Sequence, residues 1–513
     1  MSKVFLNGNT LTLEEVWEVA TAKDFIDPRH RVEVQVADEA WPRIHKSREL
    51  IEAVVRQGKP VYGVNTGFGR LSEVSIPKAE TVQLQKNLIR SHACAVGRPL
   101  ATDVVRAMML LRANALAKGY SGIRKETLQL LVDCLNAGVH PVIPSQGSLG
   151  ASGDLAPLAH LALVLMGEGK AEFRGAVLPG AEALAHAGLT PVTLQEKEGL
   201  ALINGTQAMT AIGTLAWMKA NHLVQLADGI GALTIEALAG IRDPFAQQVH
   251  ALRPHPGQET AAKALREWLA GSQLTTAQGE KRVQDAYSLR CMPQVHGASR
   301  QVVDYVQNVL KIEVNAATDN PLVFAETQEV ISGGHFHGQP VALAMDFLKI
   351  GMAEIANISE RRVERLVNPS LSGLPAFLAQ NPGLSSGLMI LQYVAASLVS
   401  ENKVLAHPAS VDSIPSSAGQ EDHVSMGTTA ARQVDELVGN AARVLAIEAI
   451  VAAQAIALQH VESRLAKRTK QLYEWIRSYV PNVTVDRSLS EEIEALAQEI
   501  LRLGGGTPSL VHA

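Results

Sequence analysis

Long stretches of this 513-residue chain repeat apolar side chains at the spacing of an α-helix. Apolar and polar positions follow that period over residues 79–93 and 100–137, which predicts helices in both stretches. Residues 35–56 show a similar pattern and predict another helix. Thr12 and Glu15 have the spacing of a capping box, which predicts that a further helix begins there.

The predicted helices become longer in the second half of the chain. Four stretches are rich in alanine and have no internal proline: 205–240, 340–367, 386–404 and 425–465. Helices of this length, with few aromatic side chains, are typical of a bundle of near-parallel rods. We therefore expect a mainly α fold with little β structure, in which a hairpin at 171–180 is the clearest strand candidate. Gly504, Gly505 and Gly506 indicate a flexible tail.

The same pattern suggests how the chain is organised. We expect a loop-rich N-terminal part over residues 1–204, a long-helix bundle over 205–475 and a C-terminal segment over 476–513. No repeat, linker or block of like charge separates these parts, so we expect one continuous body rather than independent domains.

Composition narrows the class of protein. Hydrophobic residues make up 47% of the chain and aromatic residues only 4%, and the net charge of −5 argues against a nucleic-acid partner. Cys94, Cys134 and Cys291 are too few and too scattered for a disulfide framework, which suits a cytoplasmic protein. No metal-binding motif is present, and we expect no metal. Residues 444–458 are apolar but shorter than a membrane span and contain two polar side chains, so we expect a buried helix and no membrane partner.

The most informative short segment is Ala151-Ser152-Gly153. Because glycine has no side chain, the Gly153 amide nitrogen can approach the Ala151 carbonyl and close a five-membered ring. Loss of water from Ser152 then leaves an exocyclic methylidene, an electrophile made from the chain itself. Asp154 is a good N-cap and Pro157 suits a first helical turn, so we expect a helix whose positive end faces this segment.

Other polar motifs lie far from this segment in the sequence. A glycine-rich loop follows Tyr62 over residues 62–69, and Ser91-His92 ends a predicted helix. The remaining motifs are Asn204-Gly205-Thr206-Gln207, Gln284-Asp285-Ala286-Tyr287-Ser288-Leu289-Arg290-Cys291-Met292-Pro293-Gln294, Thr318-Asp319-Asn320-Pro321, Ser332-Gly333-Gly334-His335-Phe336-His337-Gly338 and Ser416-Ser417-Ala418-Gly419-Gln420-Glu421-Asp422-His423-Val424-Ser425-Met426. Taken singly, each has an ordinary structural interpretation, such as an N-cap for Asn204 or a solvated acidic turn for Glu421.

Together, these motifs resemble the aromatic amino acid ammonia-lyases over nearly the whole chain, and most closely their histidine-specific branch. The resemblance implies that Ala151, Ser152 and Gly153 mature without external help into the cofactor 4-methylidene-imidazol-5-one. It also implies elimination of ammonia from L-histidine to give trans-urocanate, and a homotetramer whose active sites draw residues from several subunits.

The resemblance also implies roles for individual residues. Tyr62 is the base that removes a β-proton, which requires its site to lower its pKa, and Tyr287 assists at the amino group. Arg290 binds the substrate carboxylate in bidentate fashion, Asn204 bonds the prosthetic ring or the amine, and Phe336 shields the ring from water. Gln284 is placed with the substrate-binding residues, and His92 and Glu421 face the substrate imidazole.

Two alternatives remain. One is a tyrosine or phenylalanine ammonia-lyase or aminomutase, against which Ser91, His92 and Glu421 argue. The other is a non-catalytic helical scaffold, which the many separated polar motifs disfavour. His335 and Gly419 stand where many family members have asparagine, which affects local geometry more than reaction type. Residues 383–387 match the Gly-x-Ser-x-Gly motif of serine hydrolases, but no strand is predicted before them, and we interpret the match as coincidence.

Overall fold

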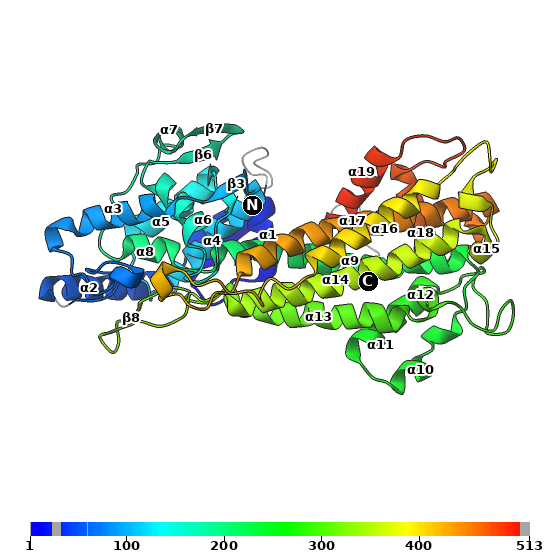
Figure 1. Ribbon diagram of the computed structural model, residues 1–513, viewed down its shortest axis with the longest axis horizontal. Helices are drawn as coiled ribbons and strands as arrows, with labels where there is room; N and C mark the ends of the chain where they lie inside the picture. Colours follow the sequence, from blue (N-terminus) through cyan, green and yellow to red (C-terminus); the bar gives the residue numbers. More distant parts are fainter. Residues whose placement is uncertain (1, 23–31, 59, 503–513) are drawn as a thin grey trace. The chain divides into compact units, whose positions relative to one another are not determined.

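The computed structural model describes residues 2–22, 32–58 and 60–502 (Figure 1). Helices contain 60% of the residues and strands 9%, which confirms the mainly α prediction. The contacts divide the chain into two compact units. The first unit consists of Met1–Leu215, Gln307–Asp346 and Pro408–Arg432, and the second consists of Ala216–Val306, Phe347–His407 and Gln433–Ala513. The three-part organisation expected from the sequence stays a prediction.

Medium-length helices and short strands make up most of the first unit. Its helices are α1 (Leu13–Thr21), α2 (Trp41–Gln57), α3 (Thr81–His92), α4 (Thr102–Ala117), α5 (Lys125–Ala137), α6 (Leu155–Leu165), α7 (Gly180–His186) and α8 (Glu198–Ile203). Thr12 accepts from the Glu15 amide and Glu15 bonds back to the Thr12 backbone, so the predicted capping box is confirmed. Helices α3, α4 and α5 confirm those predicted over 79–93 and 100–137.

The strands of the first unit form small separate sheets. They are β1 (Ser2–Leu6), β2 (Val32–Val36), β3 (Val96–Pro99), β4 (Val139–Pro141), β5 (Pro144–Gln146), β6 (Lys170–Phe173), β7 (Ala176–Pro179), β8 (Leu322–Phe324) and β9 (Glu329–Ile331). β1 pairs with β2 in parallel, whereas β3 with β5, β4 with β6, β6 with β7 and β8 with β9 are antiparallel. The β6–β7 pair confirms the hairpin expected at 171–180.

One helix boundary predicted from the sequence is wrong. Residues 35 and 36 belong to β2, and α2 begins only at Trp41 after a short 3₁₀ turn, Asp38–Ala40. The sequence of β2 alternates valine with polar residues, and its valines are buried while the polar positions are half-buried. That alternation is the period of a strand, and pairing of Val34 with Val4 of β1 fixes it there.

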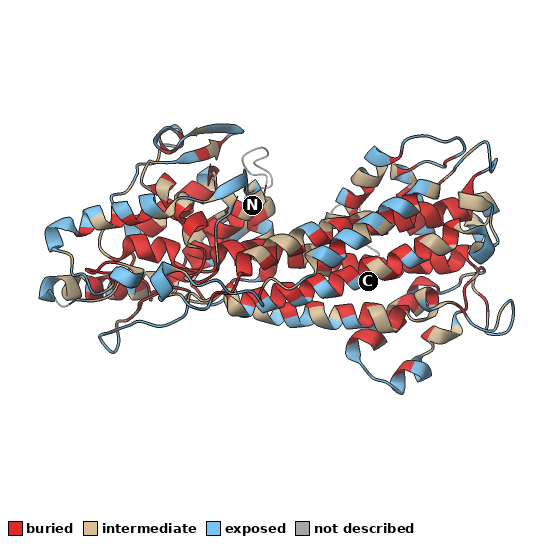
Figure 2. Cartoon of the chain, in the orientation of Figure 1, coloured by how far each residue is buried: buried red, intermediate tan, exposed pale blue. Residues whose placement is uncertain are grey.

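Four long helices run through both units: α9 (Gln207–Ala237), α13 (Met292–Glu313), α14 (Gln339–Val367) and α17 (Gly427–Gln459). In the second unit, α9, α14 and α17 lie side by side with buried inner faces (Figure 2). The other elements there are α10 (Gln247–Ala251), α11 (Pro256–Trp268), α12 (Tyr287–Arg290), α15 (Pro369–Ser372), α16 (Met389–Leu405), α18 (Lys467–Tyr479) and α19 (Ser490–Leu501).

The long-helix predictions are confirmed with small changes at their ends. The helix expected over 425–465 ends at Gln459, where His460 adopts a left-handed φ of 54°. α17 is long and apolar enough to cross a membrane, but 89% of its most apolar window is buried within the protein, as expected for residues 444–458. The glycines at 504–506 lie outside the described residues.

Candidate active site

Six of the predicted site residues surround adjoining cavities in the first unit. Tyr62, His92, Ser152, Asn204 and Glu421 line a cavity of about 520 Å³. A neighbouring cavity of about 530 Å³ shares four of these residues and adds Phe336. These six side chains come from six separate parts of the sequence, so the fold assembles the group that the motifs predicted.

The Ala151-Ser152-Gly153 loop has the tight backbone that the sequence predicts. Gly153 has a φ of +70°, and a Cβ atom added there would lie 2.3 Å from the Gly205 carbonyl oxygen. Only glycine satisfies both conditions without strain. Ala151 and Gly153 are buried, while Ser152 is half-buried and lines the cavity. The loop therefore presents its central residue to the cavity.

Asp154 follows the loop and fixes it in a way that the sequence did not predict. It occupies the N-cap position of α6, but its side chain makes no capping bond to that helix, so this part of the prediction is wrong. Its carboxylate accepts instead from the Ala208 and Met209 amides, each at 2.9 Å, at the start of α9. The hydroxyls of Ser148 and Thr428 donate to the same carboxylate. Asp154 is fully buried, and burial raises its pKa.

Ser152 makes two polar contacts that bear on the predicted ring. Its hydroxyl donates to Glu421 Oε1 at 2.6 Å, although the two residues are 269 positions apart. Its carbonyl oxygen accepts from Asn204 Nδ2 at 2.8 Å. Asn204 follows the last residue of α8, and α9 begins at Gln207, so the N-cap interpretation of Asn204 is wrong. Its amide is available for the loop because it does not cap a helix.

These contacts fit the prosthetic group that the sequence predicts. In the cyclised form, the Ser152 carbonyl is the ring carbonyl conjugated with the methylidene, and Asn204 already donates to that oxygen. A donor at this oxygen withdraws electrons from the conjugated system and strengthens the electrophile. Gly153 also packs so closely against the Gly205 backbone that no side chain would fit between them.

Tyr62 lies in the cavity with its hydroxyl accepting from the Gly69 amide at 3.3 Å. Burial raises the pKa of Tyr62 above 10.0, and the nearby Glu421 carboxylate raises it further. The Gly69 hydrogen bond acts in the opposite direction but does not outweigh burial. The groups of this chain that surround Tyr62 raise its pKa, so the prediction that the site lowers it is wrong for these groups.

His92 is the last residue of α3, as predicted, and it is held by its own helix. Its Nδ1 lies 2.9 Å from the Leu88 carbonyl oxygen, which can only accept, so Nδ1 carries the proton. Burial lowers the pKa of His92 and favours the neutral ring, in which Nε2 is an acceptor. Glu421 is fixed by the Ser416 hydroxyl, which donates to Oε2 at 2.7 Å. The cavity thus contains two oriented hydrogen-bond acceptors, His92 and Glu421.

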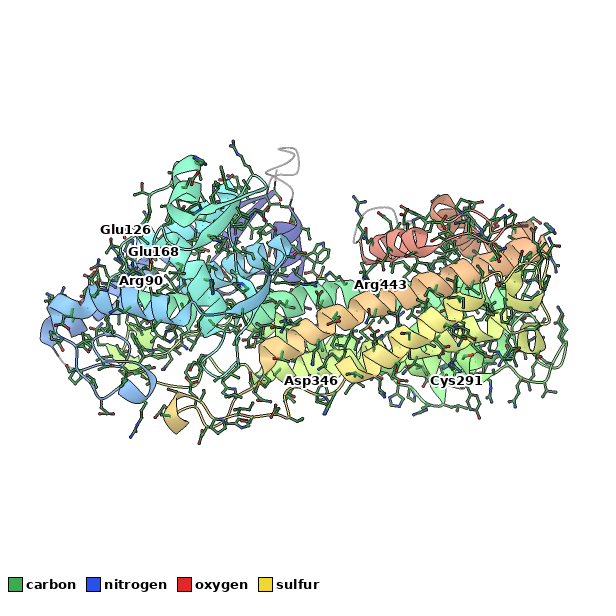
Figure 3. The ribbon with its side chains drawn as sticks, turned by 45° about the horizontal axis from the view of Figure 1, so that its top comes forward. Arg90, Glu126, Glu168, Cys291, Asp346 and Arg443 are labelled. Carbon is green, nitrogen blue, oxygen red and sulfur yellow. The ribbon has the colours of Figure 1, made fainter. Side chains whose placement is uncertain are left out.

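Buried polar side chains anchor the long loop that carries Glu421. Asp346 on α14 (Figure 3) accepts from the Ala409 and Ser410 amides near the start of this loop. Near its end, the Ser425 hydroxyl donates to the Gly150 carbonyl oxygen at 2.8 Å. The sequence analysis assigned no role to Asp346 or to Ser425, although Ser425 lies in the last motif, because no local pattern marks a distant loop as the partner of either residue.

The second unit contains the other three predicted site residues. Tyr287 and Arg290 begin and end α12, and the Arg290 guanidinium lies 4.6 Å from the centre of the Tyr287 ring, so the two side chains share a face of this helix. Tyr287 is 71% exposed and Gln284 is also exposed. Arg290 Nε donates to the Asp285 carbonyl oxygen at 2.9 Å.

The formal hydrolase motif at 383–387 is not preceded by a strand, so it does not form a nucleophile elbow. Across residues 2–22, 32–58 and 60–502, no group of three or more histidine, cysteine or acidic side chains is arranged to hold a metal ion.

Comparison with known proteins agrees with the geometry. Histidine ammonia-lyase of Geobacillus sp. (strain WCH70) is 58% identical over 496 residues, which cover 96% of both chains. The crystal structure of histidine ammonia-lyase from Trypanosoma cruzi superposes with a TM-score of 0.89 at 44% identity, covering 97% of this chain and 93% of that one. Tyrosine aminomutase from Streptomyces globisporus gives a TM-score of 0.92 at 40% identity, covering 97% of both chains.

The family described as aromatic amino acid lyase matches residues 11–478, which include every predicted site residue. The loop, the cavity around it and this match lead to the same result. The chain belongs to the aromatic amino acid lyase family, whose members use 4-methylidene-imidazol-5-one.

Proposed function

We propose that this protein eliminates ammonia from L-histidine and releases trans-urocanate, as a carbon–nitrogen lyase in histidine degradation. The observation that carries the proposal is the placement of His92 and Glu421 in one cavity with Ser152. Eight similar curated proteins, 55–59% identical to the chain, are all histidine ammonia-lyases.

We further propose that Ala151, Ser152 and Gly153 form the prosthetic group in this chain, without an added cofactor. Once formed, the group supplies an electrophilic carbon beside the bound amino acid. Asn204 holds the Ser152 carbonyl oxygen, and α6 begins two residues after the loop, with its positive end close to it. Both features favour negative charge on this part of the chain.

His92 and Glu421 explain the choice of an imidazole substrate. Both present hydrogen-bond acceptors to the cavity, and a substrate imidazole donates one N–H when neutral and two when protonated. A phenyl ring has none, so it would leave the Glu421 carboxylate without that partner in a half-buried site, which is costly. The pair therefore favours histidine over phenylalanine.

Tyr62 takes the β-proton in this proposal, and its raised pKa changes how it does so. A higher pKa makes the phenolate a stronger base but reduces the fraction that is ionised at neutral pH. The rate depends on both the strength of the base and its ionised fraction. Tyr62 therefore remains an effective base when substrate binding brings positive charge near it, because that charge favours the phenolate. The substrate ammonium, and the imidazole when protonated, supply such charge.

The remaining roles concern the ends of the substrate. Arg290 binds the carboxylate, Tyr287 assists at the amino group, Gln284 contacts the substrate and Phe336 shields the prosthetic group from water. We propose a homotetramer in the cytoplasm, with sites shared between subunits, so that these residues need not come from one chain. A dissociated monomer would then be inactive.

One assay tests the substrate and another tests the prosthetic group. Absorbance of urocanate is followed with L-histidine, while L-tyrosine and L-phenylalanine are tested in parallel for both cinnamate-type and β-amino acid products. Conversion of tyrosine or phenylalanine without urocanate would establish the lyase or aminomutase alternative, and no conversion of any of them would favour a scaffold. Mass spectrometry of the peptide that contains Ser152 should show the loss of two water molecules.

A further inference from the structure

Asp285 lies in the motif that contains Tyr287 and Arg290, but no role follows for it from the motif alone. Its side chain is 5% exposed, whereas Gln284 beside it is exposed and Tyr287 is 71% exposed. Asp285 is therefore the one polar side chain that is buried among the motif residues 284–290. A buried carboxylate in such a segment needs polar partners.

One of these partners, Ile241, lies in the connection that follows α9, and the other, Arg282, lies in the same segment as Asp285. Asp285 Oδ2 accepts from the Ile241 amide at 2.6 Å, and Oδ1 accepts from Arg282 Nε. Arg282 in turn donates to the carbonyl oxygens of Leu238 and Ala239. One carboxylate thus ties the segment before α12 to the backbone that follows α9.

The main chain of the same residue orients the arginine. Arg290 Nε donates to the Asp285 carbonyl oxygen at 2.9 Å, and its guanidinium lies over the Tyr287 ring. With Nε engaged and one face of the guanidinium on the ring, the guanidinium edge that carries Nη1 and Nη2 is available for a carboxylate. Fixing a long side chain before binding removes an entropic cost that the complex would otherwise bear.

We propose that Asp285 is a positioning residue that orients Arg290 and Tyr287 for the substrate carboxylate. The proposal rests on the carboxylate-binding role of Arg290 in the proposed function. Asp285 itself does not touch substrate. It acts by fixing the backbone from which Arg290 projects and the carbonyl oxygen that holds Nε.

The test compares Asp285→Asn with wild type in the complete assembled protein. Asparagine keeps the size and one acceptor for the Ile241 amide but loses the ion pair with Arg282. We expect kcat/KM to fall by about tenfold or more, the usual effect of weakening a charge-assisted hydrogen bond. Ser359→Ala is the matched control, because it also removes one hydrogen bond to a buried carboxylate, that of Glu448, in the same unit.

Two ligands separate positioning from general damage. D-Histidine has the carboxylate and histamine lacks it, and calorimetry measures the binding of each without turnover. Asp285→Asn should weaken D-histidine binding about tenfold and leave histamine binding within about twofold, as should Arg290→Lys. Ser359→Ala should change neither. If Asp285→Asn weakens both ligands equally, or neither, the proposal is wrong.

Failure of the proposal for Asp285 can be distinguished from failure of the proposed function. Urocanate production by the wild type decides the substrate first. If tyrosine or phenylalanine is converted instead, the matching D-amino acid and amine replace the histidine pair, because every candidate substrate has the same carboxylate. A wild type that binds the D-amino acid no better than the amine would overturn the role of Arg290, and with it that of Asp285.

Discussion

The two units use their buried polar side chains differently. In the first unit, Asn204 and Asp346 bind backbone groups of irregular segments, and Asp154 binds the free amides of the first turn of α9. In the second unit, buried charges join one helix to another, as where Glu448 on α17 accepts from Arg362 on α14 at 2.6 and 2.8 Å. A helix satisfies its own backbone, whereas a loop that is partly buried needs side chains to do so.

This difference separates chemistry from stability. The candidate reactive residues Tyr62 and Ser152 lie on loops held by a few polar contacts, whereas the second unit buries the aliphatic faces of its long helices. The segment around Asp285 supports the rule, because it is an irregular part of the second unit and is also held by a carboxylate on backbone. Substitutions in the loops should therefore change turnover most, and substitutions in the bundle should change stability most.

Ser152→Ala should have the largest effect on turnover. Without the hydroxyl, no water can leave from this residue and the methylidene cannot form, so we expect a loss of about a thousandfold or more out of the total acceleration that enzymes provide. Mass spectrometry should show no loss of two waters, and thermal unfolding should change little. An active Ser152→Ala protein would show that the electrophile comes from elsewhere.

Tyr62→Phe should have the next largest effect. The substitution removes one hydroxyl and keeps the aromatic ring, so the loop should keep its packing while turnover falls by roughly a hundredfold or more. The prosthetic group should still form, which mass spectrometry of the same sample can check. An intact ring with near-normal urocanate production would show that another residue is the base.

The raised pKa of Tyr62 adds a pH test to this variant. A general base acts when deprotonated, and its deprotonated fraction rises tenfold per pH unit below its pKa. Because burial moves the pKa of Tyr62 above 10.0, wild-type kcat/KM should rise with pH through the alkaline range. That rise should be absent from the profile of Tyr62→Phe, and if it persists there, it belongs to another group.

His92→Leu and Glu421→Gln should have intermediate effects that depend on the substrate. His92→Leu removes an acceptor, and Glu421→Gln replaces one charged acceptor oxygen with an amide donor, so we expect kcat/KM for L-histidine to fall by about ten- to a hundredfold. Thermal unfolding should shift much less than activity. If stability and activity fall together, these residues serve the fold, and the explanation of substrate choice is wrong.

The sequence predicted local features of the site better than its long-range contacts. Gly153 and the turn it allows follow from residue type alone, and so does the helix that begins after Asp154. The bonds from Asp154 to the Ala208 and Met209 amides, and from Ser152 to Glu421, join residues too far apart in the chain for any spacing rule. The error over Tyr62 has the same origin, since its pKa depends on burial and on Glu421.

The fold shows the same division between local and distant information. The 3.6-residue period located the long helices because each one buries a stripe of its own sequence. The same period wrongly places residues 35 and 36 in a helix. Their partner strand, β1, lies about thirty positions earlier, and only pairing with it distinguishes a short strand from a helix end. The sequence therefore predicted which residues form the candidate site, and the structure shows which contacts hold them.

Leu445→Ala should have the smallest effect on turnover and a large effect on stability. Leu445 lies in the part of α17 that belongs to the second unit, and its side chain has no exposed surface. Removing it leaves a cavity among packed helices, which typically costs about 2–5 kcal/mol of unfolding free energy. Urocanate production per folded molecule should remain near wild type at a temperature well below the unfolding transition, because no loop of the first unit loses a polar contact.

Leu445→Met is the control, since it keeps nearly the same volume and should cost less than about 1.5 kcal/mol. If Leu445→Ala instead lowers kcat as strongly as Tyr62→Phe while unfolding at the normal temperature, then packing in the bundle sets the geometry of the reactive loops, and the separation drawn here between the two units does not hold.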